Sequence, residues 1–234
     1  MMGKKFCAIS DLHGQIPVLK EKPDILLVAG DIVPLYYQKN SKASREWLKE
    51  EFIPFCENNC KEQAIVIGGN HDMWLANYGT TEFADMLPPT MEYLENEVVI
   101  IDEEYAILGT PLCHIFGNWW FMLPDNDIRR KLEPCIKEME EHNGKKIMLC
   151  HDAPYGVSDV ILQKDIPWAN GEHIGCQPIF DVCEKVKPDY LLHGHLHSTN
   201  HDAEFMNDGK TEVRNVSLLD ERYQMVYEPF YFEF

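Results

Sequence analysis

Five short apolar runs, each followed at once by glycine, aspartate, asparagine or histidine, limit the possible folds of this chain most strongly. Apolar runs of this length are typical of buried strands in an α/β sheet. The runs are Phe6–Ser10, Ile25–Ala29, Ala64–Ile67, Ile147–Cys150 and Tyr190–Leu192. Because open α/β sheets bind ligands beyond the carboxyl ends of their strands, the polar blocks that follow the runs are expected to form a binding site.

Three longer stretches carry spaced apolar residues among charges and predict helices. They are Ser41–Lys61, Asn126–Asn143 and Ile174–Lys187. Three other segments are rich in strand-type residues without intervening helices: Val98–Ile101, Glu104–Leu108 and the tail from Thr211 to Phe234. They predict a second, more antiparallel sheet. Since no repeat, linker or shift in composition marks a boundary, we expect a single domain over residues 1–234.

The polar blocks contain metal-binding side chains at a spacing that suits strands. They read D-L-H at 11–13, G-D at 30–31, G-N-H-D at 69–72, H-D at 151–152 and H-G-H-L-H at 193–197. Side chains two residues apart on an extended strand point to the same side, so D-x-H and H-x-H can each offer two ligands. Carboxylate, amide and imidazole groups without thiolates suit Mn, Fe or Zn. Alone, each block also fits a turn, a helix cap or a core histidine, but five such blocks in order favour a metal site.

Taken in order, the blocks resemble the signature of the calcineurin-like metallophosphoesterase superfamily: D-x-H, G-D, G-N-H-D/E, H and G-H-x-H. The resemblance covers residues 6–197. It implies a mixed α/β (α+β) fold, a four-layer sandwich of two mixed β-sheets flanked by helices. It also implies a cofactor of two transition-metal ions, with Mn expected to load in vitro. One ion would be bound by Asp11, His13, Asp31 and His197, and the other by Asp31, Asn70, His151 and His195.

Motifs between the blocks resemble a finer branch, the small cyclic-nucleotide phosphodiesterase-like proteins with a metallophosphoesterase domain. These motifs are G-T-P at 109–111, N-W-W-F at 118–121, A-P-Y-G at 153–156 and G-E-H-I-G-C at 171–176. The resemblance implies a hydrolase of small phosphodiesters, cyclic nucleotides among them, in which a metal-bridging hydroxide attacks phosphorus.

His71 follows the predicted ligand Asn70 and is the predicted general acid for the departing alkoxide; a structural histidine is the alternative. In the protein-phosphatase branch, an acid three residues after the bridging aspartate pairs with this histidine, but here that position is Pro34. Asp72 and Asp152 are the candidate partners. Substrate contacts are expected from Asn70, His71, Asn118 and His173.

The remaining histidines and the aromatic run are expected to have other roles. His193 is predicted to support the ligands and His114 is a further candidate for substrate contact, whereas His142 and His201 are expected on the surface. The run Trp119–Phe121 is expected to pack in the core, with stacking on a substrate base as the alternative.

Two missing arginines bear on the substrate. Protein phosphatases carry arginine at the positions of Leu35 and Gly68, where it grips a dianionic monoester. Their loss favours a diester. A phosphomonoesterase or protein phosphatase, a nuclease of the same fold, and a non-catalytic metal-binding scaffold remain as alternatives, the last opposed by the intact ligand positions.

The charge balance restricts the partners. The chain has 21 basic and 39 acidic residues, a net charge of -18. Such a surface repels nucleic acids and anionic membranes, so we expect a small phosphoester substrate, no long nucleic acid and no membrane. The absence of an apolar leader or a long apolar run predicts a cytoplasmic protein. The eight cysteines form no C-x-x-C pair and are expected to be reduced and mostly buried.

Overall fold

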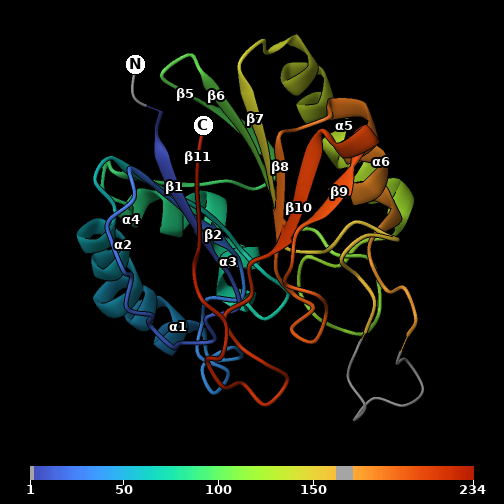
Figure 1. Cartoon of the computed structure of the whole chain (residues 1–234). Helices are drawn as coiled ribbons and strands as arrows, with labels where there is room; N and C mark the ends of the chain where they lie inside the picture. Colours follow the sequence, from blue (N-terminus) through green and yellow to red (C-terminus); the bar gives the residue numbers. More distant parts are fainter. Residues whose placement is uncertain (1–2, 162–170) are drawn as a thin grey trace.

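Two mixed β-sheets form the centre of the molecule (Figure 1). The computed structural model describes residues 3–161 and 171–234. One sheet has five strands in the order β11-β1-β2-β3-β4, and the other has six in the order β5-β6-β7-β8-β10-β9. The strands are β1 Lys5–Ile9, β2 Ile25–Ala29, β3 Gln63–Ile67, β4 Met91–Tyr93, β5 Glu97–Ile101, β6 Tyr105–Thr110, β7 Lys145–Cys150, β8 Tyr190–His193, β9 Glu204–Met206, β10 Thr211–Asn215 and β11 Phe230–Glu233.

The predicted strands are distributed between the two sheets in a different way from the one expected, in which the tail shares a sheet with Val98–Ile101 and Glu104–Leu108. β7 and β8 lie in the middle of the six-stranded sheet, between β6 and β10. That sheet is antiparallel only at its edge pairs, β5 with β6 and β9 with β10. The tail does not stay in this sheet, because β11 crosses to the five-stranded sheet and pairs antiparallel with β1. The expectation that the tail belongs to one antiparallel sheet was therefore wrong; a strand's residues do not specify a distant pairing partner.

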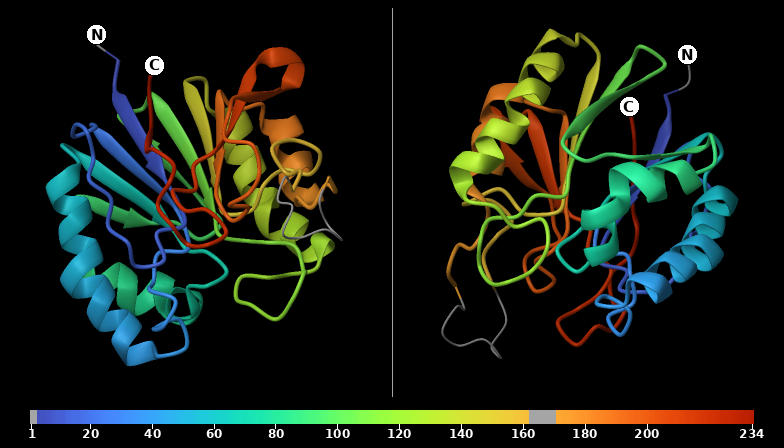
Figure 2. Two further views of the ribbon diagram at one scale, coloured as in Figure 1. Left: turned by 60° about the horizontal axis from the view of Figure 1, so that its bottom comes forward. Right: turned by 180° about the vertical axis from the view of Figure 1, so that it is seen from behind.

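The described helices lie outside the two sheets, which gives the expected four layers (Figure 2). All three predicted helices are present. The first is a continuous helical segment made of α1 Ser41–Trp47, a π-helical turn and α2 Ile53–Asn59, and the other two are α5 Asp125–Glu141 and α6 Gln177–Val186. The π-helical turn Leu48–Phe52 directly precedes the turn that contains Pro54, which has no backbone N–H to donate. The short helices α3 Met73–Tyr78 and α4 Ala84–Met86 were not predicted, because they are too short for a clear periodicity.

Alternation along each strand produces three apolar clusters. In β1, Phe6 and Ala8 face the other sheet, whereas Cys7 and Ile9 face the helices of their own side. In β7, Ile147 and Leu149 join the cluster between the sheets and their neighbours pack under α5 and α6. Strands buried on both faces must be apolar throughout, which explains the uninterrupted apolar runs in the sequence.

The carboxyl ends of the parallel strands from both sheets meet at one end of the molecule, opposite the two chain termini (Figure 1). Here the chain passes from one sheet to the other: Ser217, after β10, forms a bridge with Ser10, after β1. The N–H of Leu218 donates to the carbonyl of Ser10 at 3.1 Å. The polar blocks therefore face one another across the seam between the sheets. None of the described helices is long and apolar enough to cross a membrane.

Replacing Phe6 by alanine should reveal how strongly the two sheets are held together. Phe6 is fully buried, and its ring centroid lies 5.0 Å from that of Phe232 and 5.3 Å from that of Tyr105. The cavity left by Phe6→Ala should lower the free energy of unfolding by about 3–5 kcal/mol. Val18→Ala, at a side chain that is 91% exposed, should change it by less than about 0.5 kcal/mol. Chemical denaturation at one fixed metal concentration measures both, and equal values for the two variants would contradict this packing.

Candidate metal centre

Several of the predicted ligands adopt a backbone conformation that is rare for residues other than glycine. Asp11, His13, Asp31 and His195 have φ angles of 54°, 42°, 51° and 67°. Such conformations carry strain and persist where the surrounding structure imposes them, commonly at functional sites. Here the four residues lie in turns that follow the buried strands β1, β2 and β8.

Hydrogen bonds between the blocks fix these turns. The N–H of Asp11 donates to the carbonyl of Gly30 at 3.0 Å, and the N–H of His13 donates to the carbonyl of Asp31 at 2.9 Å. The Asp72 carboxylate is fully buried and accepts from the N–H groups of Ile32, Val33 and Gly69 at 2.9–3.1 Å. Asp72 thus holds the block after β2 against the block after β3. Burial, followed by the nearby Asp31 carboxylate, raises the pKa of Asp72 to about 7.

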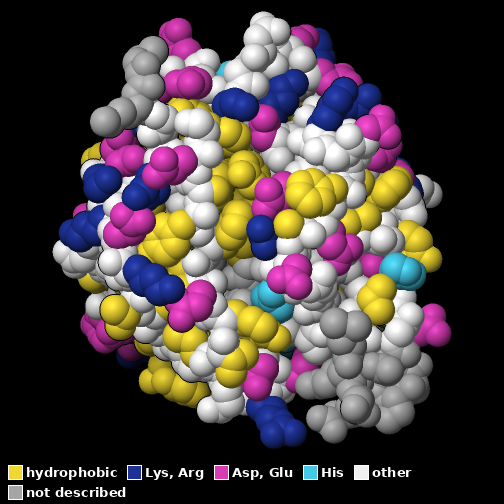
Figure 3. All heavy atoms as spheres, in the orientation of Figure 1, with side chains coloured by type: hydrophobic (Ala, Val, Ile, Leu, Met, Phe, Trp, Pro, Cys, Tyr) yellow, Lys and Arg dark blue, Asp and Glu magenta, His cyan; other side chains and the backbone are white. Residues whose placement is uncertain are grey.

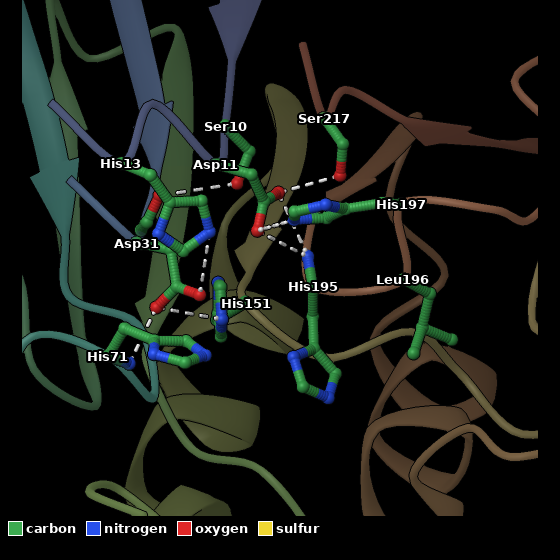
Figure 4. A network of polar contacts seen from close by, with 12 residues as sticks. Ser10, Asp11, His13, Asp31, His71, His151, His195, Leu196, His197 and Ser217 are labelled. Atoms are coloured by element: carbon green, nitrogen blue, oxygen red, sulfur yellow. Dashed lines mark hydrogen bonds and ion pairs between the residues drawn. The ribbon is translucent and has the colours of Figure 1, made fainter. Parts of the chain in front are cut away.

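The imidazoles of His13, His151 and His197 converge on two buried carboxylates, those of Asp11 and Asp31 (Figure 4). The His195 imidazole points away from Asp11 and lies instead with Cys113 and His151, whose ligand atoms are within 4.8 Å of its own. The Nε2 of His151 lies 3.4 Å from Asp31 Oδ1, and the Nε2 of His13 lies 3.6 Å from Asp31 Oδ2. The Nε2 of His197 lies 3.2 Å from Asp11 Oδ1. Ligand atoms of Asp11, His13 and His197 all lie within 4.8 Å of one another, as do those of Asp11, Asp31 and His151. Asn70 joins the second group, because its Oδ1 is 2.9 Å from the Nε2 of His151.

Backbone carbonyls orient the imidazoles in the way that metal ligands require. The Nδ1 of His151 lies 2.8 Å from the carbonyl of Ala29, and the Nδ1 of His197 lies 3.1 Å from that of Asp220. With Nδ1–H donating to a carbonyl, Nε2 faces the carboxylates, and its lone pair would bind an ion once the proton on Nε2 is displaced. The Nδ1 of His13 is buried without a hydrogen-bond partner. This set of oxygens and nitrogens fits a pair of transition-metal ions.

Electrostatic interactions keep the two carboxylates ionised. Burial by itself raises the pKa of Asp31, but the imidazoles of His151 and His71 outweigh it and hold that pKa well below the usual value. Burial likewise opposes protonation of His151, yet the Asp31 carboxylate raises its pKa to about 10. At His13 burial dominates and lowers the pKa to about 4. Two ionised carboxylates beside a neutral imidazole are the donors that a divalent ion needs.

Two glycines allow the blocks to approach this closely. A Cβ atom on Gly69 would lie 2.3 Å from Asp31 Oδ1, and one on Gly194 would lie 2.0 Å from Ser10 Oγ. Both distances are far shorter than any van der Waals contact. Only glycine fits at these positions.

The partner of His71 is Gln38, and neither Asp72 nor Asp152 contacts the imidazole. The Nδ1 of His71 lies 2.6 Å from Gln38 Oε1. Asp72 is engaged by backbone N–H groups, and Asp152 accepts from the backbone N–H and the Nδ1 of His114 at 3.1 and 2.8 Å. Both candidate assignments from the sequence were therefore wrong, since the pairing depends on a contact across 33 residues.

The predicted substrate contacts divide into two groups around two adjoining cavities. A cavity of about 160 Å³ is lined by His13, Asp31, Asn70, His71, Phe116, His195, His197, Glu221 and Tyr223. A larger cavity of about 570 Å³ shares Phe116, His195 and Glu221 with it and reaches His173. The Nδ1 of His173 lies 2.6 Å from Asp159 Oδ1. Asn118 is exposed, one residue before Trp119.

Three further histidines lie outside the set of predicted ligands. His193 is buried beneath the site, with its Nε2 3.0 Å from Ser158 Oγ. His142 and His201 lie at the surface, as expected, and both are partly buried; the His201 ring stacks on Tyr227 with centroids 3.5 Å apart. All eight cysteines are buried free thiols.

The aromatic run has two environments. Phe121 packs against the core, as expected. Trp119 does not, because its ring contacts His71 with centroids 4.4 Å apart.

Two residues that hold this site in place were missed by sequence reasoning, Gln38 and Ser217. The Ser217 hydroxyl donates to Asp11 Oδ2 at 2.6 Å, beside the backbone N–H of His195, which donates to the same oxygen at 3.0 Å. Ser217 stands between Val216 and Leu218, so no adjacent glycine, aspartate or histidine marks it. Gln38 follows the G-D block by seven positions, and only its contact with His71 reveals its role.

Comparison with known proteins finds a matching family model and relatives of low sequence identity. The model of the calcineurin-like phosphoesterase family matches residues 4–199. UPF0046 protein K07C11.7 of Caenorhabditis elegans is 25% identical over 97% of this chain and 74% of its own length. A component of the nuclease SbcCD of Staphylococcus epidermidis is 23% identical over 76% of this chain, which spans only 47% of that protein.

Solved structures show the same fold. One crystal structure aligns over 100% of both chains with a TM-score of 0.64 at 17% identity. The crystal structure of TT1561 from Thermus thermophilus aligns over 99% of both chains with a TM-score of 0.58 at 15% identity. At these identities the likeness establishes the architecture of two sheets flanked by helices.

The Asp72 carboxylate can be tested as the support of the metal site. In Asp72→Asn an NH2 group replaces one acceptor and faces a backbone N–H, so the free energy of unfolding should fall by about 1–3 kcal/mol. The variant should also retain less metal after gel filtration, because the turns that carry Asp31 and Asn70 loosen. Elemental analysis and chemical denaturation measure the two effects. Asp85→Asn, at an exposed carboxylate, is the matched control, and identical behaviour of the two variants would contradict the role given to Asp72.

Proposed function

The chain belongs to the calcineurin-like phosphoesterase family, and we propose that this phosphoester hydrolase acts on small phosphodiesters, cyclic nucleotides among them. The proposal rests on the convergence of two buried carboxylates and of imidazoles from both sheets at one cavity. Among its described lining residues, this cavity has no Lys or Arg. The convergence supports metal-assisted hydrolysis. The missing cations support a diester, whose single negative charge needs less compensation than the two charges of a monoester.

Seven side chains would hold the two ions. Asp11, His13, Asp31 and His197 are proposed for one ion, and Asp31, Asn70, His151 and His195 for the other, with Asp31 between them. Bound there, two Mn, Fe or Zn ions would act as paired Lewis acids that polarise the phosphoryl group and lower the pKa of water. The protein's own contribution is to position these ligands, through Asp72, Ser217 and the carbonyls that orient the imidazoles.

The space beside the third polar block supports the diester further. Protein phosphatases carry an arginine at the position of Gly68. Here a Cβ atom on Gly68 would lie 2.7 Å from Phe121 and 3.2 Å from the Tyr93 hydroxyl. Aromatic side chains thus fill the volume of the missing arginine. Glu221, on the rim of the cavity, adds a negative charge that disfavours a dianion.

His71 is proposed as the general acid. It lines the smaller cavity beside Asp31 and Asn70, and its Nδ1 is occupied by Gln38, so its Nε2 is left for the leaving group. His173, and Asn118 on the exposed segment before Trp119, are proposed to contact the remainder of the substrate. The larger cavity, which adjoins the ligands at His195, is the proposed place for that remainder.

A nuclease activity on long nucleic acid is the less favoured alternative, suggested by the name of the Staphylococcus epidermidis relative. Binding of a long backbone needs a row of Lys and Arg side chains. On the described part of the face in Figure 3, acidic and basic side chains are interspersed and form no continuous basic stripe. The net charge of -18 points the same way.

A substrate panel tests the proposed class. With Mn-loaded protein, kcat/KM for bis-p-nitrophenyl phosphate should exceed that for p-nitrophenyl phosphate by at least about tenfold, a difference of about 1.4 kcal/mol in transition-state stabilisation. Asp31→Asn should abolish both activities and serves as the control for contaminating enzymes. A higher kcat/KM for the monoester would favour a phosphomonoesterase, and a protein that binds no transition metal and cleaves nothing would be a scaffold.

Removing His71 tests its role as the acid. For His71→Ala, kcat should fall by about 10²–10⁴-fold on methyl phenyl phosphate, because phenolate is a poor leaving group that needs the proton. On methyl p-nitrophenyl phosphate the loss should be much smaller. The ratio of the two losses is the measurement. Equal losses on both esters would assign His71 a role in binding or structure instead.

A further inference from the structure

The His71 ring is held on several sides, and one nitrogen is left over. Its backbone N–H donates to Asp31 Oδ1 at 2.8 Å, and its Nδ1 lies 2.6 Å from Gln38 Oε1. The Trp119 ring covers it with centroids 4.4 Å apart, and the His13 ring meets it edge-on at 5.2 Å. Figure 4 shows the ring beside Asp31 and His151, with the remaining nitrogen free of hydrogen bonds to the residues drawn.

Gln38 is itself held in a rigid turn. The carbonyl of the preceding Tyr37 accepts from the N–H of Asn40 at 2.7 Å and from the hydroxyl of Ser44 at 2.8 Å. Asn40 then caps α1 by accepting from the N–H of Ala43 at 3.2 Å. The Gln38 backbone is therefore tied to the start of a helix, and its side chain is half-buried. An amide held in this way can impose a direction on the ring that it contacts.

From this geometry we infer that Gln38 is a positioning residue, which holds His71 as the Nδ1–H tautomer with Nε2 directed at the substrate. An amide oxygen can only accept a hydrogen bond, so the ring nitrogen that faces it must carry the hydrogen. Gln38 thereby takes the orienting role that a carboxylate has in other histidine pairs, without adding a negative charge beside Asp31. The inference rests on the proposed function, because positioning matters only if His71 donates a proton.

The tautomer matters in the step that expels the leaving group. As the attacking oxygen of water bonds to phosphorus, the electron pair of the breaking P–O bond passes to the leaving oxygen, and the proton on Nε2 passes to the same oxygen. The imidazolium is thereby left as the neutral ring with hydrogen on Nδ1. That is the form whose hydrogen bond Gln38 accepts, so the ring needs no reorientation after the transfer.

The tautomer can be measured without any activity. In long-range ¹H–¹⁵N correlation spectra of the Zn-loaded protein, His71 should show a protonated Nδ1 and an unprotonated Nε2 at a pH where the ring is neutral. Gln38→Leu should lose this single pattern, and Gln38→Glu, which keeps an acceptor, should retain it. A wild-type ring with hydrogen on Nε2 would overturn the inference, and this spectrum decides even if the leucine variant fails to fold.

Kinetic measurements then distinguish a role of Gln38 in positioning His71 from a role in the stability of the fold. Gln38→Leu should lower kcat on methyl phenyl phosphate by about tenfold or more and leave kcat on methyl p-nitrophenyl phosphate nearly unchanged. Gln38→Glu should restore most of the lost rate. The matched control is Gln63→Leu, at a glutamine that donates to Glu92 at 3.1 Å near the amino end of β3; it should alter neither rate.

The outcomes distinguish this inference from the proposed function. If the wild type hydrolyses no diester while its spectrum shows the Nδ1–H tautomer lost in Gln38→Leu, the proposed function fails and the contact with Gln38 stands. If diesters are hydrolysed and Gln38→Leu lowers both rates equally, the positioning role fails and the proposed function stands.

Discussion

The Asp31 carboxylate is the point on which the arrangement of both sheets depends. It is 1% exposed, lies at the carboxyl end of β2, and is approached by His13 from β1, by the N–H of His71 after β3 and by His151 after β7 of the other sheet. A buried carboxylate without such partners would be prohibitively costly. The turns that bring these partners together therefore cannot shift independently, and the strained backbone at Asp11, His13, Asp31 and His195 is maintained by their mutual contacts.

Layer packing makes this convergence possible. The apolar cluster between the sheets keeps the carboxyl ends of β1–β3 opposite those of β7 and β8, and the bridge between Ser10 and Ser217 closes the seam. The stability of the core and the geometry of the site are thus linked: a change that separates the sheets also separates the ligands. The same link explains why Gly69 and Gly194 have no room for a side chain.

Two positions beside the predicted metal ligands carry uncharged side chains where protein phosphatases carry charged ones. The volume beside Gly68 is occupied by Phe121 and Tyr93, and the carboxylate expected beside His71 is replaced by the neutral amide of Gln38. Both features lower the number of charged groups near the substrate, one cationic and one anionic. The absence of the cation supports the proposed phosphodiester, which carries one negative charge, and the neutral amide keeps a further anion away from Asp31.

By itself the sequence determined the local features: the strands, because apolar runs buried on both faces leave a clear pattern, and the donor types that follow them. The expectation that D-x-H and H-x-H lie on extended backbone was wrong, because Asp11, His13 and His195 lie in turns with positive φ after the strands end. The family resemblance extended these to the sandwich fold and the predicted ligand set. Only the tertiary structure decided that β11 leaves the second sheet, that Gln38 rather than Asp72 or Asp152 contacts His71, and that Ser217 supports Asp11. Each of these is a contact between segments far apart in the chain, for which composition and periodicity carry no signal. The physical reason is that such contacts are selected by the packing of the whole molecule, which no short stretch of residues encodes.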